Sequence, residues 1–346
     1  MVLELHVWGC NDEISVISPQ SIASAWIADI ILTSQGIPFE IIASNNTNLS
    51  PFGELPVLID DSAGDGDDNN RRVKLTGFRS LSSYLVAKYG ASQVEELTLR
   101  QKLLNDSVVN SLNETFDTLN QYNLYSNAAN YEKYTRKLFT RYFPFPMMYN
   151  QPSKFYKNAQ EKVKILGLDK GKSSFFSFST EASEVAETET FNEGTSDADA
   201  PDDGHSKGIS GLHEKYLLQK SKTNEALRES SNSMRCLMVL DKYLARLKRL
   251  RESNGGKRYL FGDLPSTSDI LFTAYMSTLT CKQLPDAFIA EYLSSREPEL
   301  IKETNLAIRD LHSHLQKTHN SFAEPKSFEV PSLYNEILYW TGLVKF

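Results

Sequence analysis

Two blocks of sequence, far apart along the chain, most constrain how it can fold. The first is Glu54-Leu55-Pro56-Val57-Leu58-Ile59, in which a proline directly precedes an apolar run. The second ends in Pro265-Ser266-Thr267-Ser268-Asp269-Ile270. Its spacing is that of a capping box, with Ser266 as the N-cap of a helix and Asp269 at position N3. The first block predicts a strand and the second the start of a buried helix, so the chain combines a sheet with helices.

The length and composition fit a globular protein with two domains. The chain has 346 residues, of which 40% are hydrophobic and 23% charged, and such a length accommodates about two domains. It contains no run of 18 or more apolar residues, so no membrane-spanning helix is predicted. Its cysteines, Cys10, Cys236 and Cys281, are scattered and form no CxxC, which indicates a reducing compartment rather than a disulfide framework.

The acidic residues are concentrated in two segments. Nine lie between Ser173 and Ser206, and five between Asp60 and Asn70, with no Lys or Arg in either segment. The formal net charge of −7 therefore conceals a net positive charge on the rest of the chain. A basic body is compatible with an acidic partner or an anionic membrane surface.

The first 90 residues have the element order of a thioredoxin-like domain. Ser18 is placed as an N-cap with Pro19 at N1, and that helix is expected to end at Gly36. A second helix is expected over 80–89. The alternation and apolar runs predict strands over 3–8, 39–43, 56–59 and 73–75.

From residue 91 onward the predicted elements are all helices. Pro144 and Pro146 must interrupt the pattern, because proline lacks an N–H and restricts the residue before it. The stretch at about 168–210 loses periodicity and is rich in Ser, Thr and acids, so we predict a disordered acidic insert there. The helices are expected over 93–124, 131–142, 154–166, 212–227, 234–250, 266–279, 300–317 and 333–343.

This organisation predicts an α+β, glutathione-transferase-like fold. A thioredoxin-like domain would span residues 1–90 and an all-helical domain residues 91–346. In thioredoxin-type domains the proline that corresponds to Pro56 is cis and leaves a backbone edge free for an extended ligand. We expect a cis bond here, although an ordinary proline at the start of a strand is the alternative.

The positions that hold glutathione in such proteins carry unsuitable residues. In glutathione transferases an acidic or amide residue and a serine follow the fourth strand. Here Gly77 and Phe78 stand there, and neither side chain can form the required hydrogen bonds. We therefore predict a degenerate ligand site that binds no cofactor.

No catalytic residue is predicted. The candidates after the first strand are Cys10, Ser15, Ser18 and Ser21. Ser18 is better explained as a helix cap. Cys10 lacks the CP(F/Y) context of the thiol-using classes, and a reactive thiol needs an electropositive setting. The sequence also shows no metal-ligand spacing and neither GxxxxGK[ST] nor GxGxxG, so no metal, nucleotide or nucleic-acid site is expected.

Two helices offer candidate protein-binding residues. The helix over 234–250 has a basic face, which is either solvated or a docking surface for acidic protein or lipid. The C-terminal stretch Leu333–Phe346 is apolar for a chain end. We expect it to pack on the core, with a partner or an interface as the alternative. The residues concerned are Lys242, Arg246, Lys248, Arg249 and Arg251 on the basic face, and Trp340 in the C-terminal stretch.

Several local motifs accompany Gly77-Phe78 along the chain. They are His6-Val7-Trp8-Gly9, Ser18 to Trp26, Ser44-Asn45-Asn46-Thr47, Glu54 to Leu58, Asn130-Tyr131, Tyr134-Thr135, Lys137-Leu138-Phe139, Phe145-Pro146-Met147 and Tyr149-Asn150. Together these motifs resemble the metaxin-like subunit of the fungal sorting and assembly machinery. The resemblance extends to about Gly167 and is looser beyond. Gly-aromatic in place of the glutathione-binding pair, as in Gly77-Phe78, is itself a mark of metaxins.

The resemblance implies a non-enzymatic protein on the cytosolic face of the mitochondrial outer membrane. Its implied partners are a barrel-forming core subunit and a second metaxin-like subunit, and an acidic receptor of the import translocase is a further candidate. Peripheral membrane association is implied, because this chain lacks the C-terminal spans of some relatives. The alternatives are a divergent glutathione-dependent transferase and a cytosolic scaffold.

Overall fold

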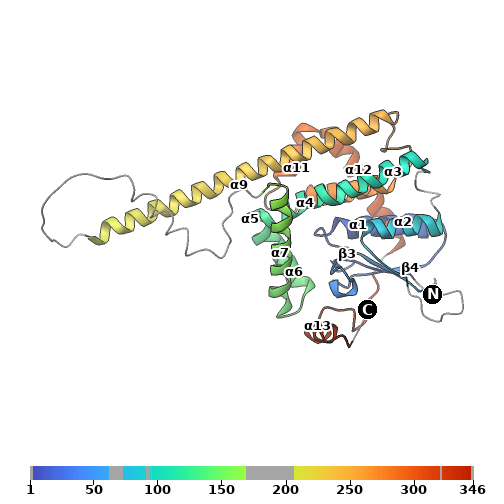
Figure 1. The fold of residues 1–346 in the computed structure, drawn as a ribbon, viewed down its shortest axis with the longest axis horizontal. Coiled ribbons are helices and arrows are strands. Elements are labelled where there is room, and N and C mark those ends of the chain that lie inside the picture. Colours follow the sequence, from blue (N-terminus) through green and yellow to red (C-terminus); the bar gives the residue numbers. More distant parts are fainter. Residues whose placement is uncertain are drawn as a thin grey trace. The chain divides into compact units, whose positions relative to one another are not determined.

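The computed structural model describes residues 3–61, 73–90, 94, 96–168, 206–319 and 322–343 (Figure 1). Its contacts divide the chain into two units. The first comprises Met1–Leu166 and Cys236–Phe346, and the second comprises Gly167–Arg235. Both predicted domains contribute to the first unit, so the boundary at residue 90 stays a prediction.

The four expected strands form one mixed sheet. Its order is β4-β1-β5-β6, in which β1 runs parallel to β4 and antiparallel to β5. Leu3 and Leu5 of β1 are buried on one face of the sheet, as the alternation along a strand requires. The expected thioredoxin-like arrangement is confirmed. The strands are β1 Leu3–His6, β4 Phe39–Ile42, β5 Val57–Asp60 and β6 Val73–Thr76.

A short hairpin follows β1 and was not predicted. Its strands, β2 Gly9–Cys10 and β3 Glu13–Ile14, have two residues each, too few for an alternation pattern. The two residues of the turn, Asn11 and Asp12, have φ of 53° and 60°. Positive φ at both positions is what a two-residue hairpin turn requires.

Helices α1 (Pro19–Ala28) and α2 (Phe78–Tyr89) pack against each other beside the sheet (Figure 1). The Ser18 side chain accepts the Ser21 N–H and so caps α1 as expected. Helix α1 continues into a π-helical turn, Asp29–Thr33, before the chain turns at Gly36 with φ +67°.

The helical part begins with an almost unbroken helical path over 99–126. Thr98 and Gln101 form a capping box that starts α3. This start is later than the expected residue 93. Pro144 and Pro146 separate two helices, as predicted. Pro146 is the N-cap of the second helix, which therefore begins at Met147 and not at the expected residue 154. The elements are α3 Leu99–Ser111, α4 Asp117–Gln121, α5 Ala128–Asn130, α6 Arg136–Tyr142 and α7 Met147–Ile165, with π-helical turns at Leu112–Phe116, Tyr122–Ser126 and Tyr131–Thr135.

Helix α9 (Ser206–Ser253) is continuous where two helices were expected. The intervening residues 228–233 include neither Gly nor Pro, so nothing there breaks a helix. Of the predicted acidic insert, the structure describes only residue 168 and residues 206–210. Residues 206–210 form the start of α9, and the rest of the insert lies outside the described residues.

Helix α10 (Thr267–Leu279) is the centre of the core. Ile270, Leu271, Ala274 and Tyr275 are essentially inaccessible, and the helix packs against α1, α3, α4 and α12. A helix that is apolar nearly all round is expected at such a position. The last helices are α11 Phe288–Arg296, which was not predicted, α12 Pro298–Thr318 and α13 Leu333–Trp340.

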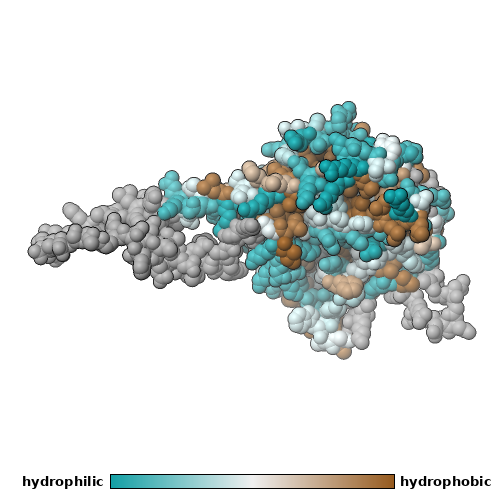
Figure 2. All heavy atoms as spheres, turned by 45° about the horizontal axis from the view of Figure 1, so that its top comes forward, coloured by the Kyte–Doolittle hydropathy of each residue, from teal (hydrophilic) through white to brown (hydrophobic). Residues whose placement is uncertain are grey.

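The surface of the described residues is mixed in character. On the face drawn in Figure 2, brown apolar surface lies among teal polar surface. Among these residues no helix is both long and apolar enough to span a membrane.

Candidate functional site

The N-terminus of α2 is closed by a side chain from α1. Gly77 is the N-cap, with φ +78°, and as a glycine it has no side chain that could cap the helix. The Phe78 N–H instead donates to Oε1 of Gln20 at 3.3 Å, and the Phe78 ring is fully buried. Free N–H groups at a helix N-terminus attract anions, but here Gln20 already occupies this position.

The cis bond that was expected at Pro56 is present, between Leu55 and Pro56. The carbonyl of Pro56 accepts the Gly77 N–H at 3.0 Å. This hydrogen bond extends the pairing of β5 with β6 by one residue.

A cleft of about 190 Å³ lies nearby, between the N-terminus of α1 and helices α4 and α7. Trp8, Ser18 and Glu54 are among its lining residues, but Gly77 and Phe78 are not. On its far side Lys162 Nζ donates to Asp117 Oδ2 at 2.9 Å. Burial lowers the pKa of Lys162, but the charge of Asp117 and this hydrogen bond outweigh burial and raise it. Two of the charged groups of the cleft, Lys162 and Asp117, are thus paired with each other.

The candidate nucleophiles lie mostly outside this cleft. Of Cys10, Ser15, Ser18 and Ser21, only Ser18 lines it. Cys10 packs against the apolar cluster around Trp8. The hydroxyl of Ser15 accepts the Tyr142 O–H at 2.7 Å, and burial raises the pKa of Tyr142 to about 12. The hydroxyl of Ser15 is thus paired with a tyrosine of α6.

Ser266 and Asp269 form the capping box at the start of α10. Asp269 Oδ2 accepts the Ser266 N–H at 2.9 Å, and Oδ1 accepts the Leu260 N–H at 3.0 Å. Burial raises the pKa of Asp269, while these hydrogen bonds act in the opposite direction. The carboxylate ties the preceding loop to the helix and faces no cleft residue.

Comparison of the sequence with protein families identifies the family of this chain. The profile described as Tom37, outer mitochondrial membrane transport complex protein, matches residues 21–156. The profile of the Tom37 C-terminal domain matches residues 187–344. This chain belongs to the Tom37 family. The metaxin-like resemblance of the sequence is thereby confirmed, and the family is one of outer mitochondrial membrane transport complex proteins.

The Tom37-family chain also resembles solved glutathione-transferase structures. A glutathione S-transferase of Ceriporiopsis subvermispora in complex with glutathione is 12% identical, with a TM-score of 0.49, over 91% of this chain and 98% of that chain. The beta-etherase LigF of Sphingobium sp. strain SYK-6 is 12% identical, with a TM-score of 0.47, over 92% and 100%. FzlA of C. crescentus is 11% identical, with a TM-score of 0.43, over 98% and 99%. A search among curated proteins found no significant match. The similarity is one of fold.

The basic residues of α9 form an exposed face on this Tom37-family chain. Lys242, Arg246, Lys248 and Arg249 are all exposed, while Leu240, Tyr243, Leu244 and Leu247 of the same helix are buried. Arg251 differs, because it donates to Glu303 and to the carbonyl of Lys257. The four exposed side chains thus form a basic face on α9.

Helix α13 presents its apolar side outward, contrary to the expectation that it packs on the core. Trp340 is 77% exposed. The inward side is polar. Asn335 donates to the carbonyls of Ser327 and Val330, and Glu336 accepts hydrogen bonds from Asn48 and Gln151. These polar contacts hold the helix so that an apolar stripe faces away from the rest of the chain. The apolar stripe consists of Leu333, Tyr334, Ile337 and Trp340, which are 49%, 70%, 60% and 77% exposed.

Sequence reasoning missed Gln20, Asn335 and Glu336. Each is an ordinary polar residue at a helical position, and its partner comes from a distant part of the chain or from a turn. Nothing in local spacing marks such a contact.

Proposed function

We propose that this chain is a non-enzymatic subunit of the mitochondrial sorting and assembly machinery. In that role it would support the insertion, folding and release of β-barrel precursors and couple the machinery to the import translocase. Its partners would be a barrel-forming core subunit and a second metaxin-like subunit. They would hold the chain peripherally on the cytosolic face of the outer membrane.

The observation that carries this proposal is the closure of α2 by Gln20. The first N–H of α2 is occupied, the ring of Phe78 is buried, and Lys162 and Asp117 of the cleft are paired with each other. Membership of an outer-membrane transport complex family supports the same conclusion.

Two exposed surfaces support a binding role. The apolar stripe of α13, defined above, has the aromatic and aliphatic character of protein-interface cores, and we assign it to a subunit of the machinery. The four exposed cations of α9 are assigned to an acidic receptor of the translocase, because charge complementarity steers association.

Two measurements on the full chain test the proposal. The first is calorimetric titration with glutathione, together with turnover of a standard electrophile. The second is isolation of the sorting and assembly machinery from solubilised mitochondria. We expect no binding, no turnover and co-isolation of the chain with the core subunit. Turnover together with absence from the isolated complex would overturn the proposal.

A divergent glutathione-dependent transferase is the second candidate. The cleft favours it, because Ser18 lies there at the N-terminus of α1. It predicts turnover that Ser18→Ala abolishes. Cys10 does not line the cleft. If only Cys10→Ala abolished turnover, Cys10 would therefore have to move into the cleft to act. A cytosolic scaffold, the third candidate, predicts a mitochondrial fraction that is free of the chain.

A further inference from the structure

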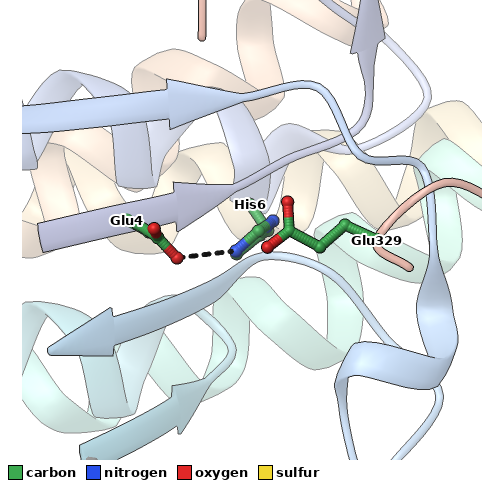
Figure 3. A group of neighbouring side chains, drawn as sticks. All are labelled: Glu4, His6 and Glu329. Carbon is green, nitrogen blue, oxygen red and sulfur yellow. Dashed lines mark ion pairs between the residues drawn. The ribbon is translucent and has the colours of Figure 1, made fainter. Parts of the chain in front are cut away.

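Three potential metal ligands meet where the C-terminal segment crosses the sheet (Figure 3). Glu4 and His6 belong to β1, and as residues i and i+2 of a strand they project on the same face. Glu329 comes from the turn that precedes α13. One ligand atom from each side chain lies within 4.8 Å of the others. His6 and Glu329 are buried, and Glu4 is partly buried.

His6 is the unusual member of this group. Its side chain is fully buried, and neither ring nitrogen has a hydrogen-bond partner. Its Nε2 points toward Oε2 of Glu4 but stays 3.9 Å away, beyond hydrogen-bonding distance. Buried polar groups almost always have a partner, so the imidazole indicates a ligand that belongs between it and the carboxylates.

The charges around His6 also favour an added cation. Lys326 Nζ lies 2.6 Å from Glu4 Oε1 and 3.7 Å from Glu329 Oε1. Two carboxylates next to the imidazole thus share one ammonium group, so Lys326 balances only part of their charge. Oε2 of Glu329 accepts the Lys326 N–H at 2.8 Å, which fixes the Glu329 side chain in place.

We propose that Glu4, His6 and Glu329 bind a divalent transition-metal ion of the zinc type. One imidazole nitrogen and two carboxylates are a ligand set that Zn²⁺ accepts, with a water completing four-coordination. Mg²⁺ and Ca²⁺ prefer all-oxygen sites. Ligands bonded at about 2.0–2.2 Å to a tetrahedral ion lie roughly 3.3–3.5 Å apart, so the 3.9 Å pair needs only a small closing movement.

The ion would tie β1 to the segment that carries α13. Ala323 already pairs with β4, since its N–H donates to the Ile41 carbonyl at 2.9 Å. A metal bond through Glu329 adds a second attachment between that pairing and the start of α13. Lys326 would compete with the ion for both carboxylates, which gives the proposal a distinctive test.

The experiment is a calorimetric titration of the metal-free full chain with ZnCl₂. It compares the wild type with Glu329→Gln, Lys326→Met and the control Glu324→Gln, whose side chain is exposed and outside the group. We expect one tight event in the wild type and in Glu324→Gln. It should weaken at least tenfold in Glu329→Gln and strengthen at least tenfold in Lys326→Met, because the competing ammonium is gone.

A second readout separates binding from misfolding. Zn²⁺ should raise the melting temperature of the wild type and slow amide exchange over 323–340, with no such effect in Glu329→Gln. Absence of a tight event in both the wild type and Lys326→Met overturns the proposal. So do equal titrations of the wild type and Glu329→Gln, which would assign binding to other surface groups.

Discussion

Gln20 Oε1 lies 3.3 Å from the backbone nitrogen of Phe78 and accepts its hydrogen bond. The contact joins the first turns of α1 and α2 at the position where an N-terminal helix end would otherwise meet an anionic ligand. A Cβ at Gly77 would make only an ordinary contact with Gln20 Oε1, at 3.7 Å, so it is the φ of +78° that favours glycine at this position.

Gln20→Ala should lower the free energy of unfolding without creating a glutathione site. We expect a loss of about 1 kcal/mol, the typical net value of one hydrogen bond, measured by urea denaturation. Gln35→Ala, at an exposed residue, is the matched control and should have almost no effect. Detectable glutathione binding by Gln20→Ala would show that this side chain alone blocks an intact site.

The capping box of α10 should be more sensitive at Asp269 than at Ser266. Ser266→Ala removes a cap and should cost about 1 kcal/mol. Asp269→Ala leaves the buried N–H groups of Leu260 and Ser266 without their acceptor, so we expect about 3 kcal/mol. Urea denaturation measures both, with the exposed Ser313→Ala as control. Equal costs for the two variants would contradict the role assigned to Asp269.

The strands and the helix starts could be predicted because their signals are local. A proline before an apolar run predicted β5, and serine caps predicted the starts of α1 and α10. These signals involve residues within a few positions of one another, as capping rules require. The single helix α9 was predicted as two helices, although no residue at 228–233 interrupts a helix.

The contacts that define the candidate surfaces could not be predicted in this way. Gln20 and Phe78 are 58 residues apart, and Asn48 and Glu336 are 288 apart. The outward direction of the apolar side of α13 depends on the second of these pairs. An amphipathic pattern shows that a helix has two faces, but only the tertiary contacts decide which face is buried.

Lys88 should make part of the stability depend on pH in the alkaline range. Its Nζ donates to the buried Asp60 at 2.6 Å. Burial lowers the pKa of Lys88, but hydrogen bonds to Asp60, Tyr84 and Tyr89 outweigh burial and raise it. The folded state therefore holds this proton more tightly than the unfolded state does. Its stabilisation is complete below the unfolded pKa of about 10.4 and is lost as pH rises through the folded pKa.

The measurement compares wild type and Lys88→Met by urea denaturation at pH 7 and above pH 10. At pH 7 we expect the variant to be less stable by about 1–2 kcal/mol, because Asp60 keeps the Tyr84 hydroxyl as a donor. The difference should shrink as pH rises. Lys137→Met, at an exposed residue, should show no such trend. A constant difference for Lys88→Met would contradict the raised pKa.

The apolar stripe of α13 should be needed for assembly but not for folding. Ile337→Ser with Trp340→Ser removes two exposed side chains, so the free energy of unfolding should change by less than about 0.5 kcal/mol. Co-isolation with the core subunit should fall at least tenfold, because central aromatic anchors dominate interfaces. Leu99→Ser with Leu103→Ser, at exposed residues of α3, is the control. Equal loss in both pairs would indicate general surface effects.

Charge reversal on α9 should weaken coupling to the import translocase. We propose Arg246→Glu, Lys248→Glu and Arg249→Glu together, since all three side chains are exposed and their removal should leave the core intact. Coupling is measured as the translocase that co-isolates with the machinery at low and at physiological salt. For the wild type it should decline as salt rises, because exposed charges are screened over about 8–10 Å at such ionic strengths. Coupling of the triple variant should already be weak at low salt and should change little as salt rises.

The same reversal at Lys302, Arg309 and Lys317 of α12, also exposed, supplies the control with equal net charge. If both triple variants lose coupling equally, net charge rather than the α9 face is responsible.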